Sequence, residues 1–207
     1  RVTHAYMAQA VSVLRAKGVA VVVDVDDDLS AIHPSNPAWA MHHPGNEGRR
    51  MAGGQVNRHS WRNLAMACRD ATLVTVSTPA LLDVYARHGR GVVLPNYLPD
   101  HYYGLARADS DVIGWPGSFH SHPNDPEAVG GAVARLVDEG AQFVMRGDPA
   151  GAGKAFGLAA DPVGGGVPIE EWPRAVAELG VGIAPLADTR FNAAKSWLKP
   201  LELSACG

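Results

Sequence analysis

The sequence predicts an α/β protein built from two parallel-sheet domains. Short β-branched or apolar runs alternate with segments of helical periodicity, most of these runs end in Gly, Pro or polar turns, and the alternation stops once and then restarts. The 207 residues are 46% hydrophobic and 19% charged, which excludes disorder as the main state. A chain of this length has enough residues for one large core or two smaller ones.

The first half opens with a segment of helical periodicity that Gly18 closes. The stretch from Pro34 to Gly54 is rich in Pro, Gly, Asn and His and lacks periodicity, so it predicts a long loop of the kind that covers a functional site. The other elements predicted here are strands at Val19 to Val23, Leu73 to Val76 and Gly91 to Leu94, and helices at Trp61 to Arg69 and Pro79 to His88.

The alternation stops around Pro95 to Asp109, and we place the domain boundary between residues 104 and 105. The elements predicted after it are strands at Val112 to Trp115, Gln142 to Met145 and Val181 to Pro185, and helices at Pro126 to Gly140, Ile169 to Leu179 and near Ala193 to Ala205. Because ligands bind beyond the carboxyl ends of the strands in open α/β sheets, we expect the site residues in the turns there.

Charge and cysteine content narrow the classes of partner. The net charge of −3 is unclustered, which argues against nucleic acid as a partner. No apolar run is long enough to span a bilayer, although peripheral contact with a membrane stays open. Cys68 and Cys206 lie far apart, which favours a reducing, cytoplasmic location. Because the chain opens with Arg1, we expect an interior fragment of a longer protein, with both domains incomplete.

The most specific pattern lies near the C-terminus, in VGIAPLADTRFNAAKSWLKPLELSACG. Lys195, Lys199 and Glu202 are spaced by four and three residues, which predicts one helical face. Two ammonium groups near a helix N-terminus make an anion site, and a carboxylate one turn further on can accept hydrogen bonds from hydroxyls. A solvated helix face with ion pairs explains the same spacing equally well.

This stretch resembles the donor-binding segment of GT-B glycosyltransferases of the family 4-like group (glycosyl transferases group 1). Three other segments agree in order: ATLVTVSTPAL from Ala71, VVLPN from Val92 and IGWPGSFHSHPND from Ile113. The resemblance implies two Rossmann-like domains facing a cleft. Residues 1–104 would be the C-terminal part of the acceptor-side domain, and residues 105–207 the N-terminal part of the nucleotide-sugar-binding domain.

The resemblance also implies a function and a set of roles. The activity would be transfer of a sugar, of the hexosyltransferase type, from a nucleotide-diphosphate sugar to an unidentified glycan, lipid or protein, without a metal or other cofactor. Lys195 and Lys199 would neutralise the departing diphosphate, and Glu202 would hold the ribose hydroxyls. The donor-binding residues would be Gly117, Ser118, His122, Arg146, Gly147, Val167, Pro168 and Ile169.

The sequence departs from the family pattern at the donor sugar. Ala194 stands where many members carry a glutamate, and the loop from Ala187 to Asn192 is longer than usual. Asp188 or Asn192 is the expected replacement acceptor of hydrogen bonds. The Arg and Lys pair that usually follows the first strand of the second domain is also missing, and Ser118, His120 and His122 stand there instead.

The acidic run at Asp24, Asp26, Asp27 and Asp28 supports a competing interpretation. It resembles the nucleophile loop of haloacid dehalogenase-like, magnesium-dependent phosphatases, with Asp24 as nucleophile and Asp26 as acid/base. Asp28, however, stands where that family usually has Thr, and Asp28 with Ser30 also fits a simple helix cap. In a glycosyltransferase, Asp24 and Asp26 would lie on the acceptor side. A non-catalytic nucleotide-sugar-binding module is the third alternative, and the nine histidines predict no metal site.

Overall fold

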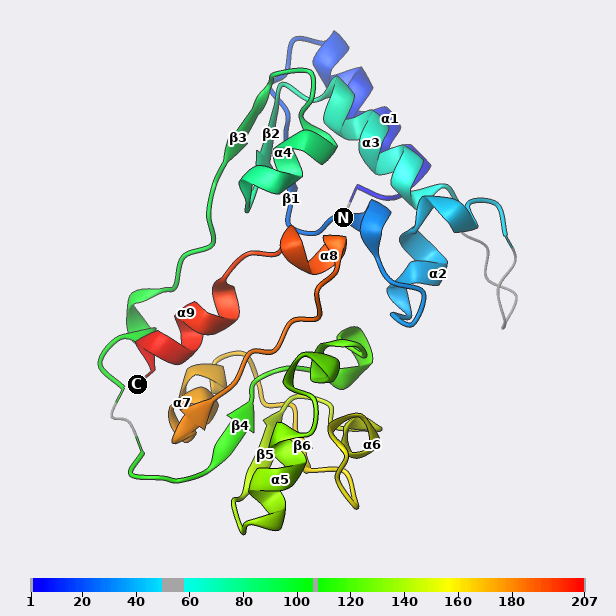
Figure 1. Ribbon diagram of the computed structural model, residues 1–207. Coiled ribbons are helices and arrows are strands. Elements are labelled where there is room, and N and C mark those ends of the chain that lie inside the picture. The colour runs from blue at the N-terminus through cyan, green and yellow to red at the C-terminus, as the bar shows by residue number, and fades with distance from the viewer. Residues whose placement is uncertain (1, 50–57, 106–107, 207) are drawn as a thin grey trace. The chain divides into compact units, whose positions relative to one another are not determined.

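The computed structural model describes residues 2–49, 58–105 and 108–206 (Figure 1). The chain forms two compact units: unit 1 comprises Arg1–Asn96 and Thr189–Ser196, and unit 2 comprises Tyr97–Asp188 and Trp197–Gly207. The chain therefore passes between the units at three points, whereas the sequence suggests a single boundary between residues 104 and 105. Both units contain a parallel sheet with helices, which confirms the α/β class and is compatible with Rossmann-like domains.

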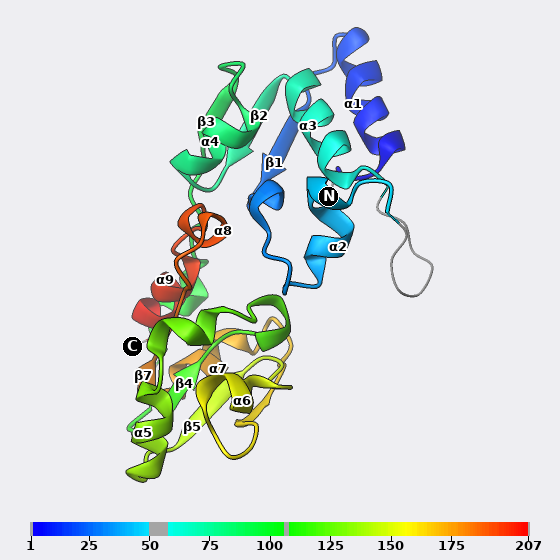
Figure 2. The same cartoon turned by 45° about the vertical axis from the view of Figure 1, so that its right-hand side comes forward.

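Unit 1 is built on a three-stranded parallel sheet in the order β1-β2-β3. Figures 1 and 2 both show α1 and α3 lying side by side in this unit. The strands are β1 (Val22–Val25), β2 (Leu73–Val76) and β3 (Gly91–Val93), and the helices are α1 (Ala5–Ala16), α2 (Ala38–His42), α3 (Ser60–Asp70), α4 (Pro79–Tyr85) and α8 (Arg190–Ala193). Val74, Val76 and Leu81 are fully buried in its core. The core also includes Ala194 from Thr189–Ser196, the segment in which the chain returns to unit 1 (the returning segment).

Unit 2 is built on a four-stranded parallel sheet in the order β6-β5-β4-β7. The strands are β4 (Ile113–Trp115), β5 (Phe143–Arg146), β6 (Val163–Gly165) and β7 (Val181–Gly182), and the helices are α5 (Ala132–Asp138), α6 (Ala152–Phe156), α7 (Trp172–Ala177) and α9 (Leu198–Ala205). Phe156 lies at the centre of one core cluster, with edge-to-face contacts to Trp115 and Phe143. A second cluster packs Tyr102, Val176 and Cys206 together.

Three sequence predictions of local structure are wrong. The stretch from Pro34 to Gly54 contains α2 and a 3-10 turn at Pro44–Asn46, although residues 50–57 lie outside the described part. The helix expected from Pro126 to Gly140 breaks into a 3-10 helix, η5 (Asp125–Val129), and α5, because Gly130 adopts a φ of +50°. The strand expected from Val19 begins only at Val22, so that Asp24 lies within β1.

A fourth prediction of local structure also fails, and it concerns the C-terminal helix, which bears on the site. The sequence predicts one helix near Ala193 to Ala205, but the structure has α8 and α9 with a non-helical segment from Ala194 to Trp197. Pro200 explains the break, because a proline in a helix interior clashes with the carbonyl four residues earlier, whereas in the first turn it is tolerated. The helix therefore begins no earlier than Leu198, where α9 starts.

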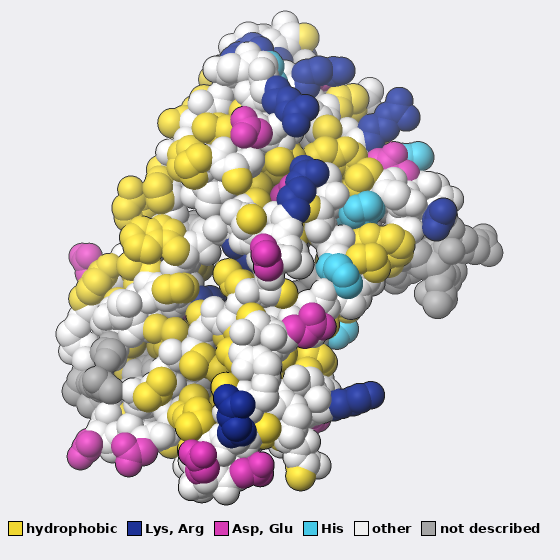
Figure 3. Space-filling model, in the orientation of Figure 1, with side chains coloured by type: hydrophobic (Ala, Val, Ile, Leu, Met, Phe, Trp, Pro, Cys, Tyr) yellow, Lys and Arg dark blue, Asp and Glu magenta, His cyan; other side chains and the backbone are white. Residues whose placement is uncertain are grey.

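The surface is mixed in character. On the face shown in Figure 3, Lys and Arg side chains lie among Asp, Glu and hydrophobic side chains. Within residues 2–49, 58–105 and 108–206, no helix combines the length and the apolar character that crossing a membrane requires.

Candidate functional site

The strand order of unit 2 indicates where a ligand would bind. The chain runs from β4 to β5 and β6 on one side of the sheet, and then places β7 on the other side of β4. In open α/β sheets, ligands bind beyond the carboxyl ends of the strands at the point where the strand order reverses. That point lies between β4 and β7, so the segments that follow these two strands form the candidate site.

The turn after β4 contacts the turn after β5 through two glycines. An ideal Cβ placed on Gly147 would lie 2.2 Å from the carbonyl oxygen of Gly117, and Gly147 has a φ of +136°. The N–H of Phe119 donates a hydrogen bond to the carbonyl oxygen of Asp148 over 3.1 Å. The structure thus brings together the predicted donor residues Gly117, Ser118 and Gly147, because the absence of a Cβ on Gly147 lets the two turns touch.

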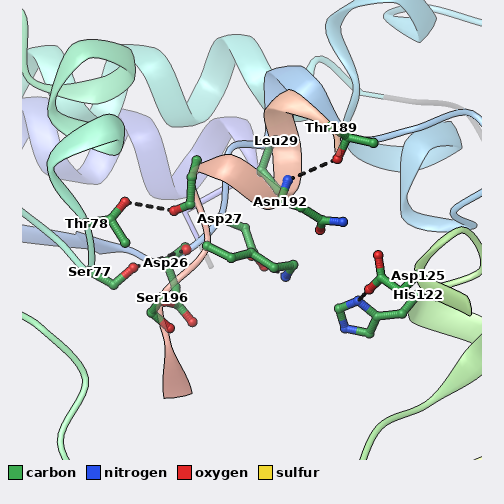
Figure 4. Close-up of polar contacts among 12 residues, drawn as sticks. Asp26, Asp27, Leu29, Ser77, Thr78, His122, Asp125, Thr189, Asn192 and Ser196 are labelled. Atoms are coloured by element: carbon green, nitrogen blue, oxygen red, sulfur yellow. Dashed lines mark hydrogen bonds and ion pairs between the residues drawn. The ribbon is translucent and has the colours of Figure 1, made fainter. Parts of the chain in front are cut away.

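His122 follows the same turn, after the 3-10 helix η4 (Phe119–Ser121). Its Nδ1 lies 2.8 Å from Oδ2 of Asp125, whose side chain is only 4% exposed (Figure 4). The other carboxylate oxygen, Oδ1, accepts a hydrogen bond from the backbone N–H of Ala187 over 3.1 Å. Asp125 therefore joins the segment after β4 to the segment after β7, the two strands between which the strand order reverses.

Glu202 lies on α9 and is buried among polar partners of unit 2. Its Oε1 accepts hydrogen bonds from Nε1 of Trp172 over 3.1 Å and from the Tyr102 hydroxyl over 3.5 Å, and its Oε2 lies 2.8 Å from Nζ of Lys199. The Lys199 ammonium also lies 4.4 Å from the centre of the Trp172 ring. Burial, followed by the charge of Glu202, raises the pKa of the Tyr102 hydroxyl, which keeps it protonated as a donor.

Lys195 does not share a helical face with Lys199 and Glu202, so that prediction is wrong for this residue. It lies in the non-helical segment between α8 and α9 and belongs to unit 1. Its Nζ lies 3.1 Å from Oδ1 of Asp27 and 4.5 Å from the centre of the Phe191 ring. Its side chain is 19% exposed, so this contact is partly shielded from water. A role of Lys195 toward a diphosphate stays a prediction.

The acidic run lies at the end of β1 in unit 1, and its members have different partners. The Thr75 hydroxyl donates to Oδ1 of Asp24, and the Asn96 amide donates to Oδ1 of Asp26 over 3.4 Å. Asp24, Asp26 and Asp27 line a cavity of about 290 Å³. The apolar part of its wall comes from Val2, Val25, Leu29 and Leu64.

Asp28 has a structural role in unit 1. It is 1% exposed, and its Oδ1 accepts hydrogen bonds from the backbone N–H and the hydroxyl of Ser30, as the helix-cap interpretation predicts. Its Oδ2 lies 3.1 Å from the Arg190 guanidinium on α8. With the pair of Lys195 and Asp27, this ion pair holds the returning segment Thr189–Ser196 on unit 1.

The remaining predicted donor residues are dispersed. Arg146, at the end of β5, turns toward α7, where it donates to the carbonyl oxygen of Ala175 over 3.3 Å and pairs with Glu178 at 2.7 Å. Val167, Pro168 and Ile169 lie between β6 and α7, and Ile169 is 72% exposed. Asp188 is exposed at the end of a unit 2 segment, whereas Asn192 lies on α8 in unit 1, with its N–H capped by the Thr189 hydroxyl (Figure 4).

Sequence reasoning missed the partners that define these sites. Asp27 was visible within the acidic run, but its pairing with Lys195 spans 168 residues of sequence. Tyr102 and Trp172 gave no signal as partners of Glu202, because an isolated aromatic residue usually indicates a core position. His122 and Asp125 gave the clearest available signal, since a spacing of three within a predicted turn allows the two side chains to meet.

Within the part of the chain that the structure describes, no group of three or more His, Cys, Asp or Glu side chains is arranged to hold a metal ion. Comparison with known proteins finds no family model that matches the chain and no significant match among curated proteins.

Proposed function

We propose that the chain is a metal-independent GT-B glycosyltransferase of the family 4-like group, of the hexosyltransferase type. In this proposal, unit 2 binds a nucleotide-diphosphate sugar and unit 1 binds the acceptor, which is a glycan, a lipid or a protein. The proposal combines the resemblance of the sequence segments with the arrangement of the turns in each unit.

The single observation that carries the proposal is the contact between Gly117 and Gly147 beside the reversal of strand order in unit 2. Two turns whose backbones touch hold Ser118, whose N–H and hydroxyl can donate to a ligand, whereas the N–H groups of Gly117, Gly147 and Phe119 already donate to Trp115, Gly165 and Asp148. A diphosphate is the ligand class proposed for this turn, since its oxygens accept hydrogen bonds from a backbone N–H and a hydroxyl.

Lys199 supplies the positive charge in this proposal. Its side chain is 41% exposed and is oriented by Glu202 and the Trp172 ring, so it can exchange part of its contact with Glu202 for a phosphate oxygen. Charge that develops on the departing diphosphate is stabilised by such a pre-oriented cation. Lys195 belongs to unit 1, and the proposal for the donor site rests on unit 2 alone.

The unit 1 cavity is the proposed acceptor site. Carboxylates accept hydrogen bonds from hydroxyls, and Asp24 and Asp26 both line the cavity. The apolar wall beside them is suited to the carbon-rich face of a sugar ring or to an alkyl chain.

Replacing Lys199 with alanine is expected to weaken binding of UDP, GDP or ADP, whichever the protein prefers, by roughly 1–3 kcal/mol. This is the range for loss of a charge-assisted hydrogen bond, and it corresponds to about a 5- to 150-fold change in affinity. Calorimetry on the whole protein measures it. Lys154→Ala is the matched control, because Lys154 is an exposed lysine on α6 of the same unit and has no assigned role. Equal affinities for the two variants would count against this site.

The haloacid dehalogenase-like phosphatase remains the second candidate, because Asp24 and Asp26 both line a cavity. The two functions differ in their need for metal, since that phosphatase chemistry requires magnesium between nucleophile and phosphate. We expect the protein to release nucleoside diphosphate from a nucleotide sugar in EDTA, and Asp24→Asn to alter acceptor use more than donor affinity. Magnesium-dependent hydrolysis of p-nitrophenyl phosphate that Asp24→Asn abolishes would replace the transferase with the phosphatase.

A further inference from the structure

His122 and Asp125 form a paired imidazole and carboxylate at the reversal of strand order in unit 2. The carboxylate is buried, with 4% of its side chain exposed, while 28% of the His122 side chain remains exposed. A buried carboxylate without a partner is costly, so the contact with His122 and the hydrogen bond from Ala187 both stabilise its charged form.

The geometry fixes which nitrogen of the ring is protonated. An ionised carboxylate only accepts hydrogen bonds, so Nδ1 of His122, at 2.8 Å from Oδ2, carries a proton. Nε2 lies on the opposite edge of the ring and points away from Asp125, as the ring in Figure 4 shows. When Nε2 is protonated as well, the ring becomes a cation whose second N–H is available to an anion.

We propose that Asp125 orients His122 so that its Nε2–H binds a phosphate oxygen of the ligand held by the turn at Gly117 and Ser118. His122 contacts the anion, and Asp125 is a positioning residue that keeps Nδ1 protonated and the ring fixed. The inference rests on the proposed function, since the anion is the diphosphate of the donor. In this inference, His122, oriented by Asp125, provides the positive charge that the missing Arg and Lys pair of the family pattern would supply after β4.

Two substitutions test the pair with little change in volume. His122→Gln removes the charge of the ring. In Asp125→Asn, the amide oxygen can still accept from the Ala187 N–H, while the amide NH₂ faces Nδ1 and donates to it. The ring then becomes a neutral tautomer, because Nδ1 cannot both accept this hydrogen bond and carry a proton. His120→Gln is the matched control, since His120 is exposed on the neighbouring η4.

The probes are inorganic pyrophosphate and, in parallel, UDP, GDP and ADP, with affinities measured by calorimetry on the whole protein. We expect each single substitution to weaken binding by about 5- to 20-fold, because the ring in Asp125→Asn and the amide in His122→Gln can still donate an N–H but carry no charge. The double variant should lose no more than either single variant, because the two residues act through one contact. His120→Gln should bind as the wild type does.

A spectroscopic readout separates positioning from general structural support. In ¹⁵N spectra of the histidine rings, added pyrophosphate should give the doubly protonated pattern for His122 in the wild type, and a neutral pattern in Asp125→Asn. If His122→Gln binds pyrophosphate as the wild type does, or if the wild type does not bind it, the inference is overturned. If His122-dependent binding is found but no nucleotide sugar is turned over, the inference stands and the proposed transferase fails.

Discussion

Replacing Gly147 with alanine is expected to destabilise unit 2 and to abolish the proposed binding of nucleoside diphosphates. The φ of +136° lies in a region that L side chains rarely adopt, which costs on the order of 1–3 kcal/mol. The new Cβ would also lie 2.2 Å from the carbonyl oxygen of Gly117, and relieving a clash with backbone costs about 1–3 kcal/mol more. Because the turn after β4 must shift, Ser118 moves with it.

Gly165→Ala is the matched control for this variant. Gly165 lies on β6 and accepts the backbone hydrogen bond from the Gly147 N–H, yet a Cβ placed on it would meet no atom within 4 Å. Chemical denaturation should therefore show a loss of roughly 2–6 kcal/mol for Gly147→Ala and little change for Gly165→Ala. A Gly147→Ala variant that retained wild-type stability and wild-type nucleotide affinity would refute the proposed contact between the turns.

Replacing Phe156 with alanine is expected to lower the free energy of unfolding of unit 2 by about 3–5 kcal/mol, the usual range for a buried phenylalanine. Phe156 is 1% exposed, and its ring contacts those of Trp115 and Phe143 at centroid distances of 5.5 and 5.0 Å. Removing it leaves a cavity against both rings and forfeits two edge-to-face contacts.

The measurement is urea denaturation followed by a probe of unit 2, such as the indole ¹⁵N–H NMR signal of Trp115, which is resolved from those of the other four tryptophans. Val163→Ala provides the comparison, because Val163 lies on a strand of the same sheet but is 73% exposed. We expect its effect to stay within about 0.5 kcal/mol, as for most surface substitutions. Similar losses in the two variants would mean that Phe156 does not hold the core of this unit together.

The sequence predicted those elements whose signals are local. The run from Leu73 to Val76 is mostly β-branched and apolar and is bounded by polar residues, and it forms β2 with the predicted bounds. The helix expected at Trp61 to Arg69 is α3, extended by one residue at each end. In both cases the residues that determine the element lie within it, so periodicity alone is sufficient.

Prediction failed where one residue overrides a pattern. Gly130 interrupts a stretch with good helical periodicity, and Pro200 prevents a helix from starting before Leu198. The heptad-like spacing of Lys195, Lys199 and Glu202 was therefore misleading for Lys195. A Gly or Pro within a stretch of helical periodicity is therefore a stronger signal than the periodicity. A single steric clash or missing N–H destabilises a helix by more free energy than several residues of high helix propensity contribute.

The candidate site was predicted only in part, because its composition depends on strand order. Gly117, Ser118 and Gly147 follow strands that are neighbours in the sheet, so their turns meet at the carboxyl ends of β4 and β5. Arg146 also ends one of these strands, yet its side chain pairs with Glu178, the residue that follows α7. The direction in which a long side chain turns depends on packing that the sequence alone does not reveal.

The return of Thr189–Ser196 to unit 1 has a consequence for how the chain acquires its structure during synthesis. Ala194 belongs to the unit 1 core, its carbonyl oxygen accepts a hydrogen bond from the Thr78 hydroxyl, and Arg190 and Lys195 pair with Asp28 and Asp27. A ribosome must therefore translate all of Tyr97–Asp188 before the last piece of unit 1 emerges. Until then, Asp27 and Asp28 of unit 1 lack the basic side chains with which they form ion pairs. Unit 1 is therefore completed only after nearly the whole of unit 2 has been synthesised.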